Sequence, residues 1–203
     1  LDVRELRRQM RAQRRALDDE TRREGESAAT ARSLEVPEIA AAATVGAYLA
    51  DDGELGTRSL LDALTDRGAD VHLPVVGDDD VLRFRSWDTR SPLVEGRWGI
   101  HIPAEWGETR SADELEVVIA PVVAADHQGT RIGRGAGYYD RSLAHRLERT
   151  GAPTIIGYAH DFQLVNQVLP RHEWDVPLDG LVTERQVLRW TDGDPSGSSV
   201  RVP

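Results

Sequence analysis

The feature that most constrains the fold is a strand, glycine loop and helix that follow one another in the second half of the chain. The apolar run Leu115–Ala125 predicts a strand buried on both faces. The glycine-rich segment Gly129–Leu143 comes next, and it leads into a helix that we expect to end at Gly151 as its C-cap. One helical face is marked by apolar residues four apart, Tyr139, Leu143 and Leu147.

The glycine segment reads GTRIGRGAGYYDRSL and combines the residue types that bind a nucleotide triphosphate. Alternating glycines let backbone N–H groups converge on an anionic oxygen, and arginine forks match phosphate. A neighbouring aspartate can hold magnesium. A helix start beside the loop favours the same anion. The residues concerned are Arg131, Gly133, Arg134, Gly135, Gly137 and Asp140.

A tight turn without a ligand is the alternative for such a loop. Two familiar nucleotide motifs do not match: the chain has no lysine for a lysine-ended phosphate loop, and the third glycine comes one residue too early for G-x-G-x-x-G. The flanking strand, helix and arginines favour phosphate binding over the turn alone.

Composition narrows the class of protein. The 203 residues suit one domain with a sizeable core, and no run of eighteen apolar residues predicts a membrane span. We expect no signal peptide, and the lack of cysteine fits a cytoplasmic protein. The net charge of −10 disfavours nucleic-acid binding, because phosphate repulsion opposes approach.

The remaining segments alternate between strand and helix patterns, which predicts an α/β three-layer domain with a largely parallel sheet. Residues 1–190 are expected to form one domain, and 191–203 a disordered tail. The expected helices are Val3–Ser33 and Thr57–Arg67, with Thr57 as N-cap. The expected strands are Thr44–Ala50, Asp70–Val76, Val81–Trp87 (an edge strand or hairpin arm), Thr154–Ala159, and one or two short strands within 179–190.

Two further segments carry possible chemistry. The arginine-rich start of the chain is either a solvated helix face or an arm that brings arginine to a phosphate. Asp175 and Asp179 are either turn residues or, for Asp175, a second magnesium ligand beside Asp140. Glu54 follows a predicted strand end, where α/β sites gather. The scattered histidines predict no zinc site, and no G-x-S-x-G elbow predicts a serine nucleophile.

Taken together, these segments resemble the 5-formyltetrahydrofolate cyclo-ligase family, from about Arg4 to Trp190. The most specific block is GTRIGRGAGYYDR. HEWDVPLDGLVTE at 172–184, WGI at 98–100, GELGT at 53–57 and the opening LRRQMRAQRRAL support it. The resemblance implies a three-layer α/β/α fold like that of ribose-phosphate isomerases and CoA transferases. It also implies ATP- and magnesium-dependent closure of 5-formyltetrahydrofolate to 5,10-methenyltetrahydrofolate, by a cytoplasmic monomer that binds neither nucleic acid nor membrane.

The resemblance also implies roles for individual residues. Arg134 and Tyr139 would be catalytic, and Asp140 and Asp175 would hold magnesium. ATP would contact Arg4, Arg7, Arg131, Ile132, Gly133, Arg134, Gly135, Ala136, Gly137, Tyr138 and Tyr139. The folate would contact Leu49, Glu54, Trp98, Arg134, Gly135, Ala136, Gly137 and Tyr138.

The chain departs from the family pattern at three positions. A lysine is usual where Val3 stands, a glutamate where Ile102 stands, and an aromatic where Ala125 stands. The departures at Val3 and Ile102 keep a folate- or nucleotide-binding homologue without turnover open as an alternative. A ligase for another N-formyl or carboxyl substrate and, remotely, an RNA-binding protein are further alternatives.

Overall fold

The computed structural model describes residues 1–89, 91–96, 101–104, 107–148 and 151–190. Its centre is an eight-stranded sheet in the order β13-β12-β10-β7-β1-β2-β3-β6. The strands from β12 to β2 run parallel, and antiparallel strands complete both edges. The bounds are β1 Thr44–Gly46, β2 Asp70–Val76, β3 Leu82–Ser86, β6 Thr109–Arg110, β7 Val117–Pro121, β10 Thr154–Tyr158, β12 Gly180–Val182 and β13 Val187–Arg189.

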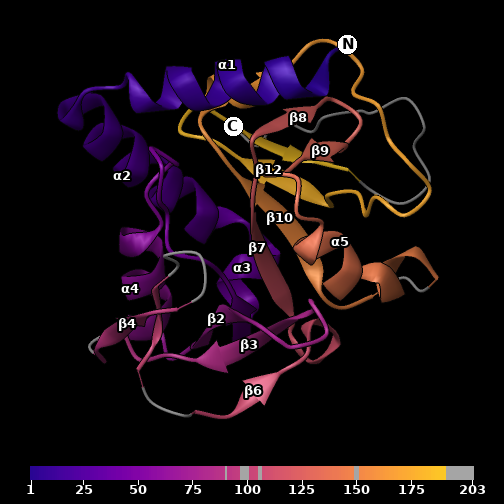
Figure 1. Cartoon of the computed structure of the whole chain (residues 1–203). Helices are drawn as coiled ribbons and strands as arrows, with labels where there is room; N and C mark the ends of the chain where they lie inside the picture. Colours follow the sequence, from indigo (N-terminus) through magenta and orange to yellow (C-terminus); the bar gives the residue numbers. More distant parts are fainter. Residues whose placement is uncertain (90, 97–100, 105–106, 149–150, 191–203) are drawn as a thin grey trace.

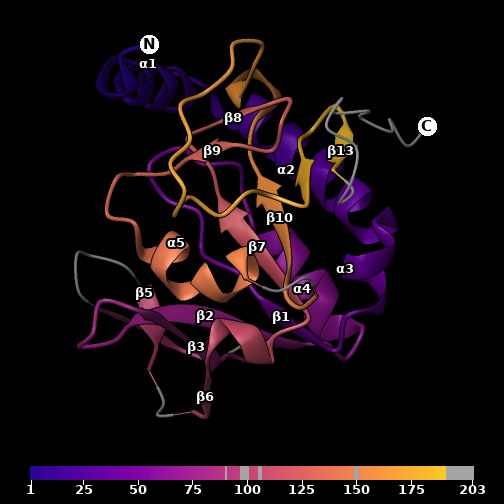
Figure 2. The ribbon, with the colours of Figure 1, turned by 90° about the vertical axis from the view of Figure 1, so that its right-hand side faces the viewer.

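Helices cover both faces of this sheet, as Figure 2 shows with α5 and α3 on opposite sides of β7 and β10. One face carries α2 (Asp19–Glu35), α3 (Pro37–Ala41) and α4 (Arg58–Asp66), and the other carries α5 (Tyr138–Ser142) and the 3-10 turn η3 (Ala144–Leu147). Along β7, Val117 and Ile119 pack on the first side while Val118 and Ala120 pack on the second. Burial of alternate residues on both faces is expected of a central parallel strand. The predicted layered α/β fold with a largely parallel sheet is therefore confirmed.

A smaller sheet and α1 (Val3–Arg15) lie beyond one end of the main sheet (Figure 1). The small sheet has the order β11-β8-β9, with β8 at Ala124–Asp126, β9 at Arg131–Ile132 and β11 at Leu164–Val165. Leu6 of α1 packs in a cluster with Ala124, Ile132 and Leu169. The amphipathic α1 therefore covers the small sheet and not the main one.

The prediction of one strand at Leu115–Ala125 is wrong, because the run divides into β7 and β8 in different sheets. Pro121 ends β7, and proline has no N–H with which to continue a ladder. The Gln163 side-chain amide donates to the carbonyl oxygens of Val122 and Val123, at 2.8 and 2.9 Å. Those two bonds satisfy the backbone where the chain leaves the main sheet.

Two predicted helices are shorter than expected. The N-terminal helix breaks after Arg15, and Asp18 caps the start of α2 by accepting from Thr21 N at 2.7 Å. The helix after the glycine loop is only α5 followed by η3, and Leu147 is 40% exposed. Gly151 therefore does not cap it. Thr57 is the N-cap of α4 as predicted, but its hydroxyl donates to Tyr48 O at 2.7 Å and does not bond to the helix.

The other predicted strands are found with small shifts. β2 has the predicted bounds, β3 and β10 are trimmed at their ends, and β1 is only the first three residues of the predicted strand. β3 is a hairpin arm that pairs with β2, which is one of the two predicted roles, and it is not an edge strand because β6 pairs with its other side. The remaining elements are β4 (Leu93–Glu95), β5 (His101–Pro103), η2 (Ala112–Glu114) and η4 (Asp161–Gln163). The predicted tail lies outside the described residues. Within the described residues, no helix is both long and apolar enough to span a membrane.

Candidate functional site

A cavity of about 1260 Å³ opens at the carboxyl ends of the central strands. Its wall is formed by β2 and β3, the segments that follow β1 and β7, the β4–β5 strand pair, the glycine loop with α5, and residues within 170–175. The first turn of α1 closes it with Val3 and Arg7. The carboxyl edge of a parallel sheet is where α/β proteins bind ligands, because loops from several strands meet there.

The glycine loop, residues 133–137, forms one wall of this cavity between β9 and α5. Gly135 and Gly137 have φ angles of +108° and +69°, which side chains with a Cβ rarely adopt. Arg7 holds the loop from α1, with its Nε donating to Gly133 O at 2.8 Å. The loop is therefore held by an arginine from the N-terminal helix, and contact of this arginine with a phosphate stays a prediction.

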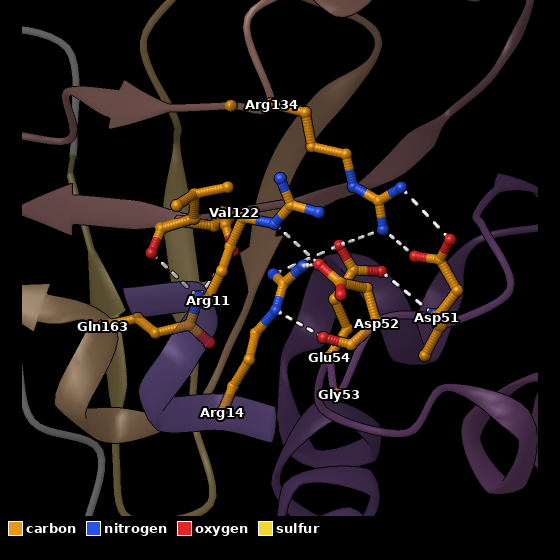
Figure 3. A network of polar contacts seen from close by, with 12 residues as sticks. Arg11, Arg14, Asp51, Asp52, Gly53, Glu54, Val122, Arg134 and Gln163 are labelled. Atoms are coloured by element: carbon orange, nitrogen blue, oxygen red, sulfur yellow. Dashed lines mark hydrogen bonds and ion pairs between the residues drawn. The ribbon is translucent and has the colours of Figure 1, made fainter. Parts of the chain in front are cut away.

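Arg134 extends from the glycine loop to the turn that follows β1 (Figure 3). Its Nη2 lies 3.1 Å from Glu54 Oε1, and its Nη1 lies 3.1 Å from Asp51 Oδ2. The guanidinium thus joins two sequence segments that are eighty residues apart and line the same cavity.

Glu54 is a carboxylate with little access to water, since its side chain is only 4% exposed. Burial raises the pKa of Glu54 to about 7, against the opposing effect of the Arg14 guanidinium. A carboxyl group of this kind changes charge near neutral pH. Its carboxylate oxygens can accept hydrogen bonds from ligand N–H groups.

Two tyrosines at the start of α5 complete the wall of the cavity. The hydroxyl of Tyr139 is buried, and within the described part of the chain it has no hydrogen-bond partner. Burial and the nearby Glu54 raise the pKa of Tyr139 well above its usual value. The phenol therefore stays protonated and can donate to a ligand oxygen. Tyr138 is covered by the Arg141 guanidinium, 5.1 Å from the ring centroid.

The two predicted magnesium ligands each accept a hydrogen bond from the 172–176 segment, Asp175 Oδ2 from His172 N at 2.7 Å and Asp140 from Val176 N. Asp140 Oδ1 accepts from Val176 N at 3.2 Å, so the residue after Asp175 is joined directly to Asp140. Arg131 binds the same Oδ1 through Nη2 at 2.6 Å and donates from Nη1 to the Val176 carbonyl. Both aspartates line the cavity.

Carboxylate oxygens are the kind of ligand that magnesium binds in proteins. Mg²⁺ is usually held by one or two carboxylates together with substrate phosphates and water. Among the described residues, no group of three or more histidine, aspartate or glutamate side chains forms a metal cage. The assignment of Asp140 and Asp175 as magnesium ligands stays a prediction.

Most of the predicted site residues line the cavity together. They are Arg7, Leu49, Glu54, Arg131, Ile132, Gly133, Arg134, Gly135, Ala136, Gly137, Tyr138, Tyr139, Asp140 and Asp175. Arg4 is exposed on α1 and is not among the residues that line the cavity. Trp98 lies outside the described residues. Three residues were expected to depart from the family pattern. Two of them, Val3 and Ile102, line the cavity, and the third, Ala125, is buried in the core.

Sequence reasoning missed three residues around Glu54. Asp51 pairs with Arg134, Arg14 is buried behind the turn, and His160 contacts the turn backbone. The solvated-face interpretation of the N-terminal arginines holds for Arg8, whose side chain is 72% exposed, but not for Arg14, which is fully buried. The sequence does hold acidic partners for a buried arginine, because a buried arginine has to be paired with carboxylates and the segment DDGE at 51–54 supplies three of them.

Comparison with known proteins gives one consistent result. A profile of the 5-formyltetrahydrofolate cyclo-ligase family matches residues 2–184. The 5-formyltetrahydrofolate cyclo-ligase of Escherichia coli K12 is 40% identical over 185 residues, covering 89% of this chain and all of that protein. The protein of the same name from Mycolicibacterium smegmatis is 32% identical over 148 residues, covering 70% of this chain and 74% of that one.

Solved structures agree with this result. The 5,10-methenyltetrahydrofolate synthetase of Aquifex aeolicus superposes with a TM-score of 0.81 at 31% identity, covering 96% of this chain and 95% of that one. The synthetase of Mycoplasma pneumoniae, at 20% identity and a TM-score of 0.71, covers 91% of this chain and 99% of that one, and it shows the shared fold.

Proposed function

Because the chain belongs to the 5-formyltetrahydrofolate cyclo-ligase family, we propose that it converts 5-formyltetrahydrofolate to 5,10-methenyltetrahydrofolate with ATP, releasing ADP and phosphate. The observation that carries this proposal is that the arginine-bearing glycine loop and Glu54 face each other in one cavity. One wall suits phosphates, and the other suits a heterocycle rich in N–H groups. Residues 1–190 would act as one cyclo-ligase domain, in the cytoplasm.

The reaction requires little covalent participation from the protein. The formyl oxygen attacks the γ-phosphorus and ADP leaves. N10 then attacks the formyl carbon, loses its proton, and closes the ring as phosphate departs with the former formyl oxygen. Phosphoryl transfer of this kind depends on positioning and on charge stabilisation. A loop with arginines and without a nucleophilic side chain supports that chemistry.

On the nucleotide side, the N–H groups of the glycine loop and the fork of Arg134 would contact the phosphates. Arg7, bonded to Gly133 O, would hold α1 over them. The protonated Tyr139 hydroxyl would donate to an oxygen that gains charge during transfer. Asp140 and Asp175 would hold magnesium, which when bound supplies positive charge to the phosphate oxygens.

On the folate side, Glu54 would accept hydrogen bonds from the ring N–H and amino groups of the pterin. Leu49 lines the cavity close to Glu54 in the sequence and offers apolar surface for the ring. Phosphates would be repelled by the Glu54 carboxylate, so the two ligands are sorted to opposite walls. The folate and ATP nevertheless have to touch each other within the cavity, because the formyl oxygen must reach the γ-phosphorus.

The proposal is tested by incubating the purified chain with 5-formyltetrahydrofolate, ATP and magnesium, and following the absorbance of the methenyl product. Matched reactions without ATP or with excess chelator are the controls. We expect product only in the complete mixture, with one ADP released per product. ATP binding without product would instead support the binding homologue, and ADP release only with another N-formyl or carboxyl compound would support a different ligase.

A further inference from the structure

The turn Asp51–Glu54 presents different side chains to its two sides. Asp51 and Glu54 line the cavity, whereas Asp52 contacts the arginines of α1. Two successive residues of this turn, Asp52 and Gly53, have φ angles of +52° and +75°. A residue with a Cβ is uncommon in that region and stays there only when surrounding contacts hold it. The direction of the Glu54 side chain therefore depends on what holds the turn.

Arg14 of α1 contacts the turn through its guanidinium, as the dashed lines in Figure 3 show. Its side chain is fully buried, and its three nitrogen atoms all face the turn. Nε donates to Asp52 O at 2.8 Å, Nη2 lies 2.6 Å from Asp52 Oδ2, and Nη1 lies 3.4 Å from Glu54 Oε1. One guanidinium thus binds the backbone of the turn and also the carboxylate of Glu54.

His160 holds the same turn from the segment after β10. Its Nε2 lies 3.1 Å from Gly53 O, and because a carbonyl only accepts, this nitrogen must carry the hydrogen. The ring is 3% exposed and stacks on Phe162 at 5.4 Å between centroids, and His160 N donates to Gln163 Oε1 at 3.0 Å. These contacts fix the direction of the imidazole N–H.

We infer that Arg14 and His160 are positioning residues that hold the Asp51–Glu54 turn in the conformation that presents the Glu54 carboxylate to the cavity. Neither side chain lines the cavity, so neither acts by touching a ligand. The expected consequence of this positioning, tight binding of the folate, rests on the proposed function. The positioning concerns the turn itself, so it can be measured without any substrate.

The experiment compares matched pairs of variants. His160→Leu removes the N–H that Gly53 O accepts, and His160→Gln keeps an amide donor near the same place. His72→Leu is the control, because His72 is equally buried but lies in β2. Arg14→Lys keeps the charge and loses the three-way fork. Its control is Arg146→Lys, since Arg146 is 10% exposed and pairs with Asp179 outside the cavity.

Two readouts are taken on each folded variant: hydrogen exchange of the peptide that contains residues 51–54, and steady-state kinetics with each substrate varied. We expect faster exchange in His160→Leu and Arg14→Lys but not in the controls. The KM for 5-formyltetrahydrofolate should rise about tenfold, the cost of one hydrogen bond that positions a binding group, with kcat and the KM for ATP nearly unchanged. His160→Gln should recover most of the folate affinity.

Exchange and folate KM that match the control variants would overturn the inference. So would a fall in kcat together with a rise in both KM values, since that pattern indicates general disruption. If Arg14→Lys does not fold, the three histidine variants decide the matter. If the wild-type chain fails to convert the folate, the proposed function is what fails, and the exchange measurement alone decides whether the two residues hold the turn.

Discussion

Arg134 of the glycine loop and Glu54 of the turn after β1 form an ion pair across the cavity, with Nη2 3.1 Å from Oε1. The same guanidinium pairs with Asp51, whose side chain is 54% exposed. A ligand that enters between these groups has to exchange the pair for contacts of its own. A phosphate would bind Arg134, and a pterin would bind Glu54. The two residues can therefore be tested separately.

Replacing Arg134 should slow phosphoryl transfer. Arg134→Ala removes a charged fork from the transferred phosphate, and we expect kcat to fall about 10²–10³-fold. Arg134→Lys should recover little of this, because a point charge cannot reproduce a bidentate contact. Steady-state kinetics with saturating ATP measure both variants, with the exposed Arg8→Ala as the control. Full activity of the lysine variant would contradict a forked contact.

Replacing Glu54 should weaken folate binding and leave the nucleotide unaffected. Glu54→Gln keeps the shape and loses the charge, and a charged hydrogen bond is worth about 1.5–3 kcal/mol, or roughly ten- to more than a hundredfold in affinity. The assay belongs at pH 8, where a carboxyl group of pKa about 7 is ionised. Calorimetry with ATP alone should show little change. A loss of ATP affinity with unchanged folate affinity would place Glu54 on the nucleotide side.

The raised pKa of Glu54 also predicts how stability depends on pH. The pKa of Glu54 rises from 4.5 in the unfolded chain to about 7 in the folded protein, mainly because of burial. The folded protein therefore binds this proton more tightly than the unfolded chain does. Its contribution to the free energy of unfolding is therefore full below pH 4.5 and is lost as pH rises to about 7. The loss is of the order of 3 kcal/mol.

Glu54→Gln lacks this proton, so urea denaturation of the two proteins isolates the effect. The difference in free energy of unfolding, wild type minus variant, should decrease between pH 4.5 and 7. Other charged groups near Glu54, namely Arg11, Arg14, Asp52 and Arg134, are present in both proteins and largely cancel. A difference that stays constant or grows with pH would show that folding does not raise the pKa of Glu54.

Removing either aspartate of the Asp140–Asp175 pair should weaken magnesium-dependent turnover. We expect Asp140→Asn and Asp175→Asn each to lower kcat about 10²–10³-fold and to raise the magnesium concentration required. Asp140→Asn should also lower the melting temperature, because Asp140 pairs with Arg131. Asp179→Asn is the matched control, since Asp179 binds Arg146 and the backbone of Ile155 away from the cavity. If both variants depended on magnesium concentration as the wild-type protein does, Asp140 and Asp175 would not be magnesium ligands.

Short-range patterns in the sequence predicted the elements that depend on local physics. The segment Asp70–Val76 was predicted as a strand from its own residues, and β2 has those bounds. The same reasoning failed at Leu115–Ala125, where apolar character is equal on both sides of Pro121. The division into two sheets depends on where distant strands offer backbone partners, and apolar periodicity carries no such information.

The glycine loop, its arginines and its aspartate could be predicted from the sequence, because glycine spacing and residue chemistry are local properties. Only the tertiary structure decided which partners these residues meet: Glu54 for Arg134, Gly133 for Arg7, and Val176 for Asp140. It also decided that Arg14 is buried while Arg8, on the same helix, is exposed. The physical reason is that burial and ion pairing are set by contacts between segments, and these form only when the sheet brings its strand ends together.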